Sequence, residues 1–323
     1  MRIAAVFVTY GDRRELLLSA LNSALACESV KQVVIVDNNS EKSLINDIGP
    51  NFTKRTGKVV RYQRNAENTG SAGGYAQAIA LARSLPDIDA ILLLDDDLCI
   101  SQASIEAASE QMLSQPNVVF QIPRSDRAEQ FAYLNGTKSP TISTNSFHDF
   151  SLVSLPARVR RARPQRVSLV SVEFATFAGL VIPINVALDV ALPDARLFLY
   201  CDDYDYVRRI INDGFLVNLI DVAPLTSIDA SWNQDHHISP AFFDPYASPT
   251  RCYYSVRNRV IYERKYHVNS NLLYAANMVS LLSVGLLISL FEFRSPRATF
   301  KRLSLILSAI IAGIKNDLQH RRP

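Results

Sequence analysis

The sequence predicts an α/β fold whose mostly parallel sheet is flanked by helices, and three observations support this prediction. Residues 90–94 are all apolar and run directly into the three aspartates 95–97, which is typical of a strand buried on both faces of a sheet. An apolar run over 3–9, a helical pattern over 15–26 and a second apolar run over 33–36 form a strand–helix–strand unit. This order indicates a parallel pair with a right-handed crossover. A chain of 323 residues that is 48% hydrophobic can bury one large core.

The acidic triplet lies where a ligand would bind, because open α/β sheets bind ligands beyond the carboxyl ends of their strands. Two carboxylates about 4 Å apart repel each other by roughly 4 kcal/mol at an effective dielectric constant near 20, so the triplet needs a cationic partner. In an extended strand Asp95 and Asp97 would point to one side and Asp96 to the other. Two carboxylates on one side form part of an oxygen site for a hard divalent ion. The alternative is an acidic loop that caps a helix.

Polar residues also follow the other predicted strands. Asp37 ends the second apolar run and could accept hydrogen bonds from a ribose or a base, or could instead organise a turn. A third strand is expected over 59–62, followed by Arg64, which is a candidate for phosphate or base contact or a solvated charge. The glycine-rich segment 65–74 precedes a helix expected over 76–84, where backbone N–H groups could approach a phosphate or glycine could relieve a tight turn.

A second acidic cluster lies about a hundred residues downstream. Asp202, Asp203 and Asp205 follow an apolar lead-in and fall in the first turn of a predicted helix, where the helix dipole favours carboxylates. The functional alternative is that one of them is a general base. Between the two clusters we expect a helix over 102–114, and apolar strand segments within 116–123 and 168–183.

Composition excludes several classes of protein. A net charge of +3 gives no argument for a nucleic-acid partner. The four cysteines are scattered without a CxxC pair, which argues against a zinc cluster or a disulfide scaffold. The N-terminal apolar run is too short for a signal peptide and is interpreted as the first strand.

Two further segments have more than one interpretation. Five arginines within 158–166 suit an anionic lipid or a pyrophosphate-bearing acceptor, or form a solvated loop. The only tryptophan, Trp232, is followed by His236 and His237. Either histidine could complete a metal site, although an adjacent pair is more often a surface feature.

The C-terminal region is strongly apolar. Residues 268–291 contain no charge, and as a helix they would measure roughly 36 Å against a hydrocarbon core of about 30 Å. Asparagines and serines dilute this segment, basic residues follow it, and a second apolar run over 303–314 is too short to span a bilayer. We expect helices that lie on or partly in a membrane, anchored by basic flanks. A helical pair packed on the catalytic domain and a dimer interface are the alternatives.

These motifs, in this order, resemble those of the inverting family-2 glycosyltransferases with the GT-A fold, particularly bacterial galactofuranosyl- and rhamnosyltransferase-like members. The resemblance covers roughly residues 3–260. It rests on Val8-Thr9-Tyr10, Val36-Asp37-Asn38-Asn39-Ser40, Asn65 through Gly74, Asp95-Asp96-Asp97, Asp202-Asp203-Tyr204-Asp205-Tyr206, and Tyr253-Tyr254 with Arg257-Asn258.

The resemblance implies a role for each matching residue. Asp203 corresponds to the base that deprotonates the acceptor, and Asp95 with Asp97 corresponds to the DxD pair that binds ribose and a Mn²⁺ or Mg²⁺ ion. The resemblance also implies that Thr9, Asp37, Arg64 and Asn68 hold the nucleotide. Asp96, Asp202 and Trp232 are further candidate substrate-binding residues.

One departure concerns the metal. The family often has a metal-binding histidine some two dozen residues after the base, and residues 223–229 contain none. Asp229, His236 or His237 would have to substitute, or the metal would have fewer protein ligands.

The sequence therefore predicts a metal-dependent inverting glycosyltransferase with a catalytic domain over 1–225, an acceptor-side segment over 226–267 and a membrane-associated helical region over 268–323. The expected donor is UDP-galactofuranose, with dTDP-rhamnose second. The expected acceptor is a lipid-linked or cell-surface glycan at the cytoplasmic face of the inner membrane, with the enzyme peripheral or monotopic.

Two other functions stay open at this stage. A nucleotidyltransferase would use Arg13 and Arg14 to hold a triphosphate and would release pyrophosphate. A membrane-bound scaffold would keep the fold without turnover.

Overall fold

The computed structural model describes residues 1–48, 53, 56–153, 165–229 and 240–319. Two compact units divide the chain. Unit 1 comprises Met1–Pro140, Ala162–Ala195 and Asp203–Ala230, and unit 2 comprises Thr141–Arg161, Arg196–Asp202 and Ser231–Pro323.

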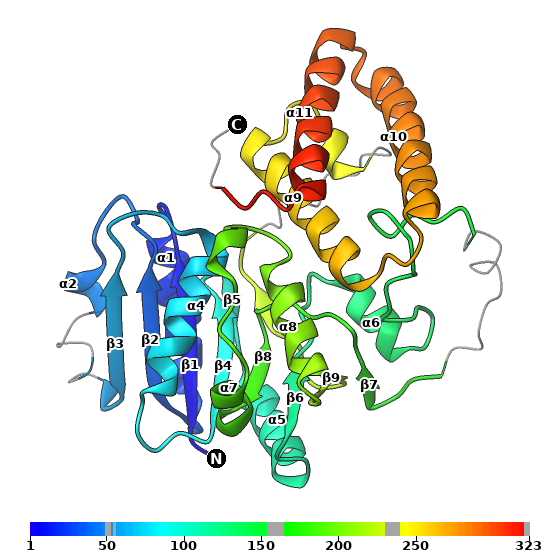
Figure 1. Ribbon diagram of the computed structural model, residues 1–323. Helices are drawn as coiled ribbons and strands as arrows, with labels where there is room; N and C mark the ends of the chain where they lie inside the picture. Colours follow the sequence, from blue (N-terminus) through cyan, green and yellow to red (C-terminus); the bar gives the residue numbers. More distant parts are fainter. Residues whose placement is uncertain (49–52, 54–55, 154–164, 230–239, 320–323) are drawn as a thin grey trace. The chain divides into compact units, whose positions relative to one another are not determined.

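Unit 1 is built on a mixed eight-stranded sheet with the order β3-β2-β1-β4-β8-β6-β9-β7 (Figure 1). The half formed by β3, β2, β1 and β4 is entirely parallel, and β8 and β7 run antiparallel to their neighbours. The strands are β1 Ile3–Thr9, β2 Val30–Asp37, β3 Val59–Arg64, β4 Ala90–Asp95, β6 Val118–Gln121, β7 Leu169–Ser171, β8 Leu180–Pro183 and β9 Leu216–Ile220. A separate antiparallel pair joins β5 Leu98–Cys99 to β10 Thr226–Ser227. The predicted fold class is confirmed.

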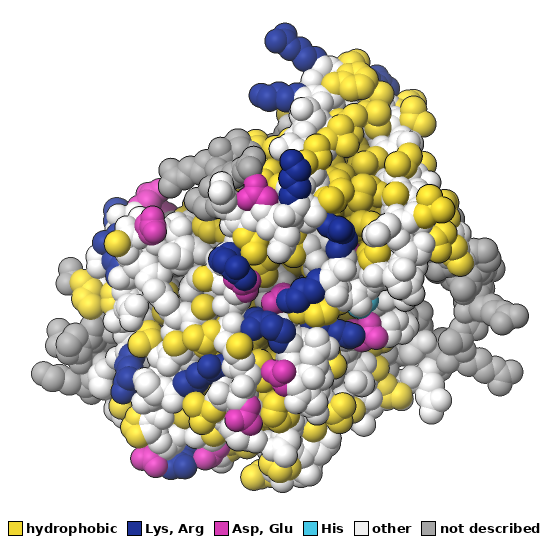
Figure 2. Space-filling model, viewed as in Figure 1, with side chains coloured by type: hydrophobic (Ala, Val, Ile, Leu, Met, Phe, Trp, Pro, Cys, Tyr) yellow, Lys and Arg dark blue, Asp and Glu magenta, His cyan; other side chains and the backbone are white. Residues whose placement is uncertain are grey.

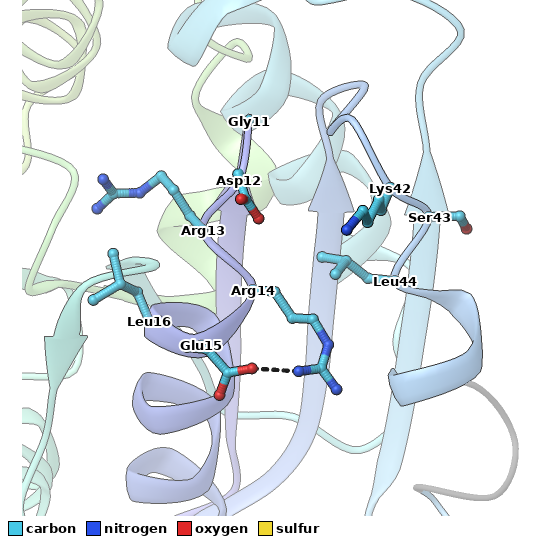
Figure 3. A pocket seen from close by; sticks show the side chains of 9 residues that line it. All are labelled: Gly11, Asp12, Arg13, Arg14, Glu15, Leu16, Lys42, Ser43 and Leu44. Atoms are coloured by element: carbon cyan, nitrogen blue, oxygen red, sulfur yellow. Dashed lines mark hydrogen bonds and ion pairs between the residues drawn. The ribbon is translucent and has the colours of Figure 1, made fainter.

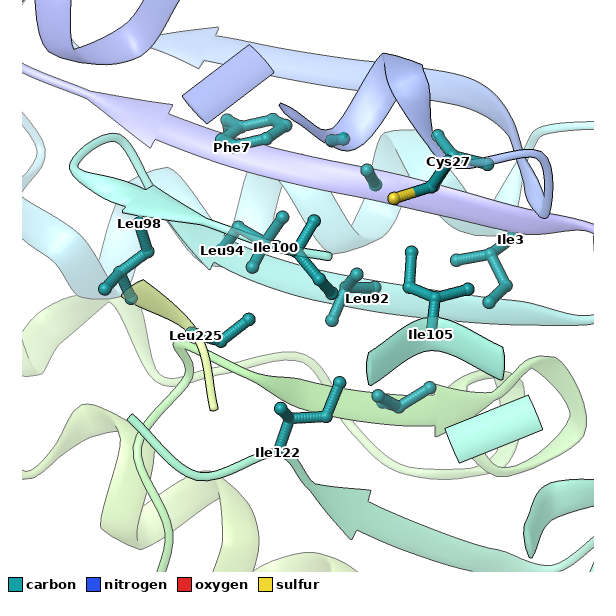
Figure 4. Close-up of a cluster of buried hydrophobic side chains, with 14 of the residues drawn as sticks. Ile3, Phe7, Cys27, Leu92, Leu94, Leu98, Ile100, Ile105, Ile122 and Leu225 are labelled. Atoms are coloured by element: carbon teal, nitrogen blue, oxygen red, sulfur yellow. The ribbon is translucent and has the colours of Figure 1, made fainter. Parts of the chain in front are cut away.

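Helices cover both faces of the sheet. On one face, α1 Arg14–Ala26 and α5 Gln102–Ser114 pack against β1 and β4, where Phe7, Leu92 and Ile105 belong to one buried cluster (Figure 4). On the other face, α4, α7 and α8 form a second cluster with β4, β8 and β9. The remaining helices of unit 1 are α2 Ile45–Ile48, α4 Gly70–Arg83, α6 Ala128–Leu134, α7 Ile184–Asp189 and α8 Asp202–Asn212, which starts one residue inside unit 2.

Two expected elements differ from those observed. The helix expected over 76–84 begins at Gly70, so residues 70–74 of the glycine-rich segment form its first turn and only residues 65–69 precede it. The strand expected over 168–183 is two short strands, β7 and β8, that pair with different neighbours. In both cases the pattern of apolar or small residues predicted the type of secondary structure, but it did not predict where each helix or strand begins and ends.

The glycines of α4 allow it to lie close to the sheet. A Cβ atom on Gly74 would lie 2.5 Å from Cγ1 of Val8 on β1, and one on Gly73 would lie 2.5 Å from Cβ of Thr69. Both distances are too short for non-bonded carbon atoms. Close packing of α4 on β1 therefore requires glycine at position 74, whereas glycine at position 73 leaves room for the Thr69 side chain at the start of the same helix.

Unit 2 is helical. It consists mainly of α9 Pro249–Tyr266, α10 Asn271–Phe293 and α11 Pro296–Ile314, with short 3₁₀ turns η2 Ala195–Leu197 and η3 Ala241–Phe243. Tyr254, Val260, Ile306 and Ala309 contribute to its own buried core. Buried Glu263 of α9 accepts hydrogen bonds from Arg259, Tyr274 and the backbone of residue 148.

We predict that Gly74→Val destabilises the protein by about 1–3 kcal/mol, because the added side chain must displace Val8 or move α4 away from β1. Ala80→Val on the exposed face of the same helix is the matched control, and it carries only the ~0.5 kcal/mol loss of helix propensity. Urea denaturation of the two variants checks this. Equal midpoints would show that α4 is not closely packed on β1.

Candidate functional site

The carboxyl ends of the four parallel strands meet along one edge of the unit 1 sheet. Register pairs Thr9 of β1 with Asp37 of β2, and Asp37 with Arg64 of β3, while Val8 pairs with Asp95 of β4. The sequence places a polar side chain at each of these ends, and the register brings them into one row. The candidate site is this row together with the acidic triplet.

Arg13 binds the acidic triplet from the loop between β1 and α1. Its Nε donates to Asp96 Oδ1 at 2.8 Å, its Nη2 to Asp97 Oδ2 at 2.7 Å and its Nη1 to Asp229 Oδ2 at 3.0 Å. Thr9 Oγ1 donates to the other Asp96 oxygen at 2.7 Å. One guanidinium group, with a single positive charge, therefore bridges three carboxylates at once.

The side chains of the triplet do not alternate as in an extended strand. β4 ends at Asp95, and Asp96 and Asp97 lie in the turn before β5. Because of this turn, Asp96 and Asp97 both reach Arg13, so the expected placement of Asp96 opposite its two neighbours is wrong. The triplet is not a helix cap either, because Ser101 Oγ accepts from Ser104 N at the start of α5.

Two further side chains hold Asp95. Arg124, which follows β6, donates to Asp95 Oδ2 at 3.0 Å and pairs through its other nitrogens with Asp126. The hydroxyl of Tyr75 on α4 lies 2.8 Å from Asp95 Oδ1. Burial and the nearby Asp95 raise the pKa of the Tyr75 phenol well above its usual value, so the phenol stays a hydrogen-bond donor.

Asp229 reaches this site through the β5–β10 pair. Thr226 and Ser227 pair with Cys99 and Leu98, and the amide of residue 228 donates to Asp97 O at 3.0 Å. The segment after β9, where the sequence lacks the expected histidine, is therefore joined directly to the acidic turn.

One oxygen of the triplet is left for a cation. Asp97 Oδ1 is buried and has no hydrogen-bond partner among the described residues. Burial and repulsion from Asp95 raise the pKa of Asp97, and burial raises the pKa of Asp96 to about 6. Both shifts indicate carboxylates whose charge is not fully compensated. In the described part of the chain, however, no three His, Cys, Asp or Glu side chains are already arranged as a metal site.

Asp37 organises the loop after β2. It is fully buried, its Oδ1 accepts from Ser40 N at 2.7 Å, and its Oδ2 accepts from Tyr62 OH at 2.5 Å. Arg64 Nε lies 3.5 Å from Asp37 Oδ2, and Arg64 Nη2 donates to Ser40 O at 2.6 Å. These bonds correspond to the turn-forming alternative for Asp37, and they fix the position of the Arg64 guanidinium at the sheet edge.

Asn38 joins this loop to the start of α4. Its Oδ1 accepts from Asn65 Nδ2 at 3.1 Å and from Thr69 N at 2.9 Å, and its Nδ2 donates to Asn68 Oδ1 at 3.0 Å. Asn68 Oδ1 also accepts from Gly70 N at 2.9 Å. Asn68 therefore lies in an amide network that fixes the beginning of α4 beside β2.

The second acidic cluster forms the start of α8, as predicted. Asp205 is held by Arg209, four residues later, at 2.9 Å, which is a structural ion pair. Asp203 Oδ1 accepts from the Tyr204 amide at 2.8 Å. Asp202 is buried.

A chain of aromatic rings connects α8 to the acidic triplet. The Tyr75 ring, whose hydroxyl contacts Asp95, lies 4.4 Å from the Phe177 ring between centroids. The Phe177 ring in turn lies 5.9 Å from that of Tyr206, three residues after Asp203. Both acidic clusters are thus anchored to one face of the same sheet.

Within unit 2, α9 holds the strained segment that leads into α8. Phe198, Tyr200 and Cys201 have positive φ angles of 65°, 68° and 58°, which are costly for residues other than glycine. Asn258 Nδ2 lies 2.7–2.9 Å from the carbonyl oxygens of Leu197, Leu199 and Tyr200. Arg257 Nη2 donates to the Leu197 carbonyl at 3.0 Å. The Arg257-Asn258 motif therefore fixes the backbone just before Asp203.

A pocket lies beside the first strand end. It is lined by residues 11–16 and 42–44. Figure 3 shows that the Arg13 and Arg14 side chains extend to different sides of the loop that carries them. Arg14 pairs with Glu15. Arg13 and Arg14 therefore do not form the joint triphosphate clamp that a nucleotidyltransferase would require.

Several predicted residues lie outside the described part of the chain. These are Trp232, His236 and His237, together with the basic segment up to position 164. Arg166, at the end of that segment, pairs with Asp221.

Arg13 is predicted from the sequence only as a triphosphate contact of the nucleotidyltransferase alternative, and Tyr75 and Arg124 are not predicted as candidates. A signal existed for Arg13, because three adjacent carboxylates need a cation. Tyr75 and Arg124 gave no such signal, since only the folded chain brings them to Asp95.

Solved structures with the same fold were found. A crystal structure of residues 1–349 of S. aureus TarS matches with a TM-score of 0.52 at 13% identity, over 98% of this chain and 82% of that one. TarS 1–349 in complex with UDP-GlcNAc matches with a TM-score of 0.54 at 12% identity, over 98% and 83%. GalNAc-T7 with UDP, GalNAc and Mn²⁺ matches with a TM-score of 0.54 at 10% identity, over 82% of this chain but 48% of that one. At these identities the likeness shows the fold alone.

The sequence itself gives the family. No match was found among curated proteins. Residues 5–167, just over half of the chain, match the family described as Glycosyl transferase family 2. This stretch contains Thr9, Asp37, Arg64 and the acidic triplet, so the matched region and the sheet edge coincide. The chain belongs to glycosyl transferase family 2 and is a glycosyltransferase that uses a nucleotide sugar.

Proposed function

We propose that this enzyme is a metal-dependent inverting glycosyltransferase that takes its sugar from a UDP-linked donor bound at the carboxyl edge of β3-β2-β1-β4. One observation carries the proposal. Asp95, Asp96 and Asp97 lie at the end of the central strand, gathered by Arg13 and Arg124, and one buried Asp97 oxygen has no partner among the described residues.

The acidic turn suits a divalent ion. Mg²⁺ and Mn²⁺ are typically bound by one or two carboxylates, with substrate phosphate and water completing the coordination. Asp95 and Asp97 can supply the two carboxylates. When bound, such an ion neutralises charge on the leaving nucleoside diphosphate. The crystal structure of GalNAc-T7 contains UDP and Mn²⁺ together, which supports this proposal by analogy of fold.

The remaining groups supply positioning and proton transfer. We assign contacts with the nucleoside to Arg64 and Asn68, and the bonds of Arg64 to Ser40 O and of Asn68 to Asn38 support this because they hold both side chains near the sheet edge. Asp203 takes the proton of the acceptor hydroxyl as that oxygen bonds to the anomeric carbon. The bond between the anomeric carbon and the phosphate oxygen breaks in the same displacement, and the nucleoside diphosphate leaves.

For the donor sugar, the motifs favour UDP-galactofuranose, with dTDP-rhamnose second. TarS has been crystallised with UDP-GlcNAc and with UDP, which supports a uridine nucleotide rather than a particular sugar. We propose a lipid-linked or cell-surface glycan as the acceptor. Family membership favours sugar transfer over the nucleotidyl transfer and scaffold alternatives.

We also propose that unit 2 binds a membrane surface. Among the described residues, one helix, α10, is long and apolar enough to cross a bilayer, and only 22% of its most apolar window is buried. Its polar Asn277 and Ser289 face the protein, where Asn277 donates to Asn145 O and Ser289 Oγ donates to Phe243 O. The outer face of α10 is therefore mostly apolar, with Ser283 as an exposed polar side chain in the middle of the helix.

This face has the features of a helix that lies in the membrane interface. Leu272, Leu287 and Phe291 are 81%, 67% and 80% exposed, and α11 adds further exposed apolar side chains (Figure 2). Exposed Arg294 and Arg297 lie at the connection between the two helices, where each adds about 1 kcal/mol of attraction to an anionic surface. Because α10 packs on unit 2 along its length, we favour a helix lying on the bilayer over one crossing it.

For catalysis, we predict that Asp203→Asn lowers the rate of sugar transfer by at least 10²-fold, because general-base catalysis is lost. Binding of UDP and the thermal midpoint stay at wild-type values. Transfer assays with UDP-galactofuranose, dTDP-rhamnose and UDP-GlcNAc check this.

The matched control is Asp205→Asn, two residues away. It breaks the ion pair with Arg209, so it should lower the thermal midpoint while turnover of the folded fraction persists. If Asp203→Asn retains full transfer activity, Asp203 is not the base.

For membrane binding, we predict that the protein sediments with vesicles of phosphatidylcholine plus phosphatidylglycerol and less with phosphatidylcholine alone. Leu287→Glu combined with Phe291→Glu should abolish sedimentation, because two apolar anchors become charged. Leu113→Glu, at a 73% exposed leucine of α5, is the control and should bind like wild type. The membrane proposal is contradicted if the wild-type protein does not sediment with vesicles. If the wild type instead forms dimers and the double variant is monomeric, the apolar face is an interface between two copies of the chain.

A further inference from the structure

Two arginines, Arg13 and Arg124, bind the acidic triplet, but they differ in exposure and in their other ion pairs. Arg124 is 6% exposed and makes two bonds to Asp126 besides the one to Asp95. The Arg13 side chain is 29% exposed, and its three ion pairs all go to carboxylates of the site. The two bonds to Asp126 hold Arg124 in place independently of Asp95. Arg13 has no such ion pair outside the site among the described residues, so it can leave the triplet without breaking one.

Arg13 also holds the carboxylate that a divalent ion would need. Its Nη2 lies 2.7 Å from Asp97 Oδ2, while Asp97 Oδ1 is buried without a partner among the described residues. A divalent ion at Asp97 would lie close to the guanidinium, and two cations at such a distance repel each other. The ion and Arg13 therefore cannot both be bound strongly to Asp97.

A diphosphate offers Arg13 another partner. A guanidinium group binds phosphate oxygens through paired N–H donors at least as well as it binds carboxylates. Arg13 precedes the first turn of α1, and no side chain caps that helix end, so the helix does not depend on the position of the Arg13 side chain.

Building on the proposed function, we propose that Arg13 is the resident counter-cation of the acidic triplet. It competes with the divalent ion for Asp97 and moves to the diphosphate when the nucleotide binds. The ion and the nucleotide then bind cooperatively. The ion alone binds weakly because Arg13 competes for Asp97, and the nucleotide draws Arg13 away from Asp97. This arrangement makes Arg13 a positioning residue that keeps the empty site intact and prevents the ion from occupying it without the donor.

The test measures Mn²⁺ binding without turnover. Free Mn²⁺ is followed by electron paramagnetic resonance during titration of the wild type, Arg13→Gln, Arg13→Lys and Arg14→Gln, first without nucleotide and then with saturating UDP. Arg13→Gln should bind Mn²⁺ alone at least about 5-fold more tightly than wild type, the lower end of coupling between linked sites. UDP should then strengthen Mn²⁺ binding less in this variant than in wild type.

The other variants sharpen the outcome. Arg13→Lys keeps the charge but cannot bridge three carboxylates, so its Mn²⁺ affinity should fall between those of wild type and Arg13→Gln, and it carries the test if Arg13→Gln does not fold. Arg14→Gln, which alters a neighbouring arginine on the other side of the loop, should match wild type.

Two negative results are distinguishable. If wild type binds Mn²⁺ and UDP together but the Arg13 variants bind Mn²⁺ alone no more tightly, the competition is refuted while the proposed function stands. If wild type binds no UDP with or without Mn²⁺, the proposed function itself is refuted.

Discussion

The repulsion among three consecutive carboxylates at the end of a buried strand is the constraint on which this site depends. Asp95, Asp96 and Asp97 cannot remain together unless cations compensate them, and at these distances each unpaired repulsion costs several kcal/mol. The fold supplies Arg13 from the first loop and Arg124 from the strand beyond β8. Because these two arginines come from distant parts of the sequence, the acidic turn also ties the edge of the sheet together.

Strand ends and the acidic positions could be predicted from the sequence, because buried parallel strands are continuous apolar runs with polar residues at their ends. The helix over 102–114 was predicted with its observed bounds, and Asp203 was placed correctly in the first turn of a helix. The partners of those residues could not be predicted. Tyr75 and Arg124 reach Asp95 only through the packing of α4 and the order of strands in the sheet, and neither shows in a local pattern.

The C-terminal helices illustrate the same limit. From composition, the asparagines and serines of α10 only weaken a predicted membrane span. In the structure Asn277 and Ser289 point inward and bond to backbone carbonyl groups, so the same residues leave the outer face mostly apolar. Both faces of α10 contain leucine, so the sequence alone does not show which face is turned inward. The inward face is identified only when the surface of unit 2 that α10 contacts is known.

The proposed function requires that the acidic turn binds a nucleoside diphosphate together with a divalent ion. Calorimetric titration of UDP, dTDP and GDP, each with and without Mn²⁺, measures this binding. We predict that UDP binds best, that its binding requires Mn²⁺, and that Asp97→Ala weakens UDP binding while Asp213→Ala, at an exposed aspartate after α8, does not. If the folded protein binds none of the three nucleotides, the proposed function is refuted. If it binds UDP equally well after Asp97→Ala, the acidic turn is a structural feature and the donor lies elsewhere.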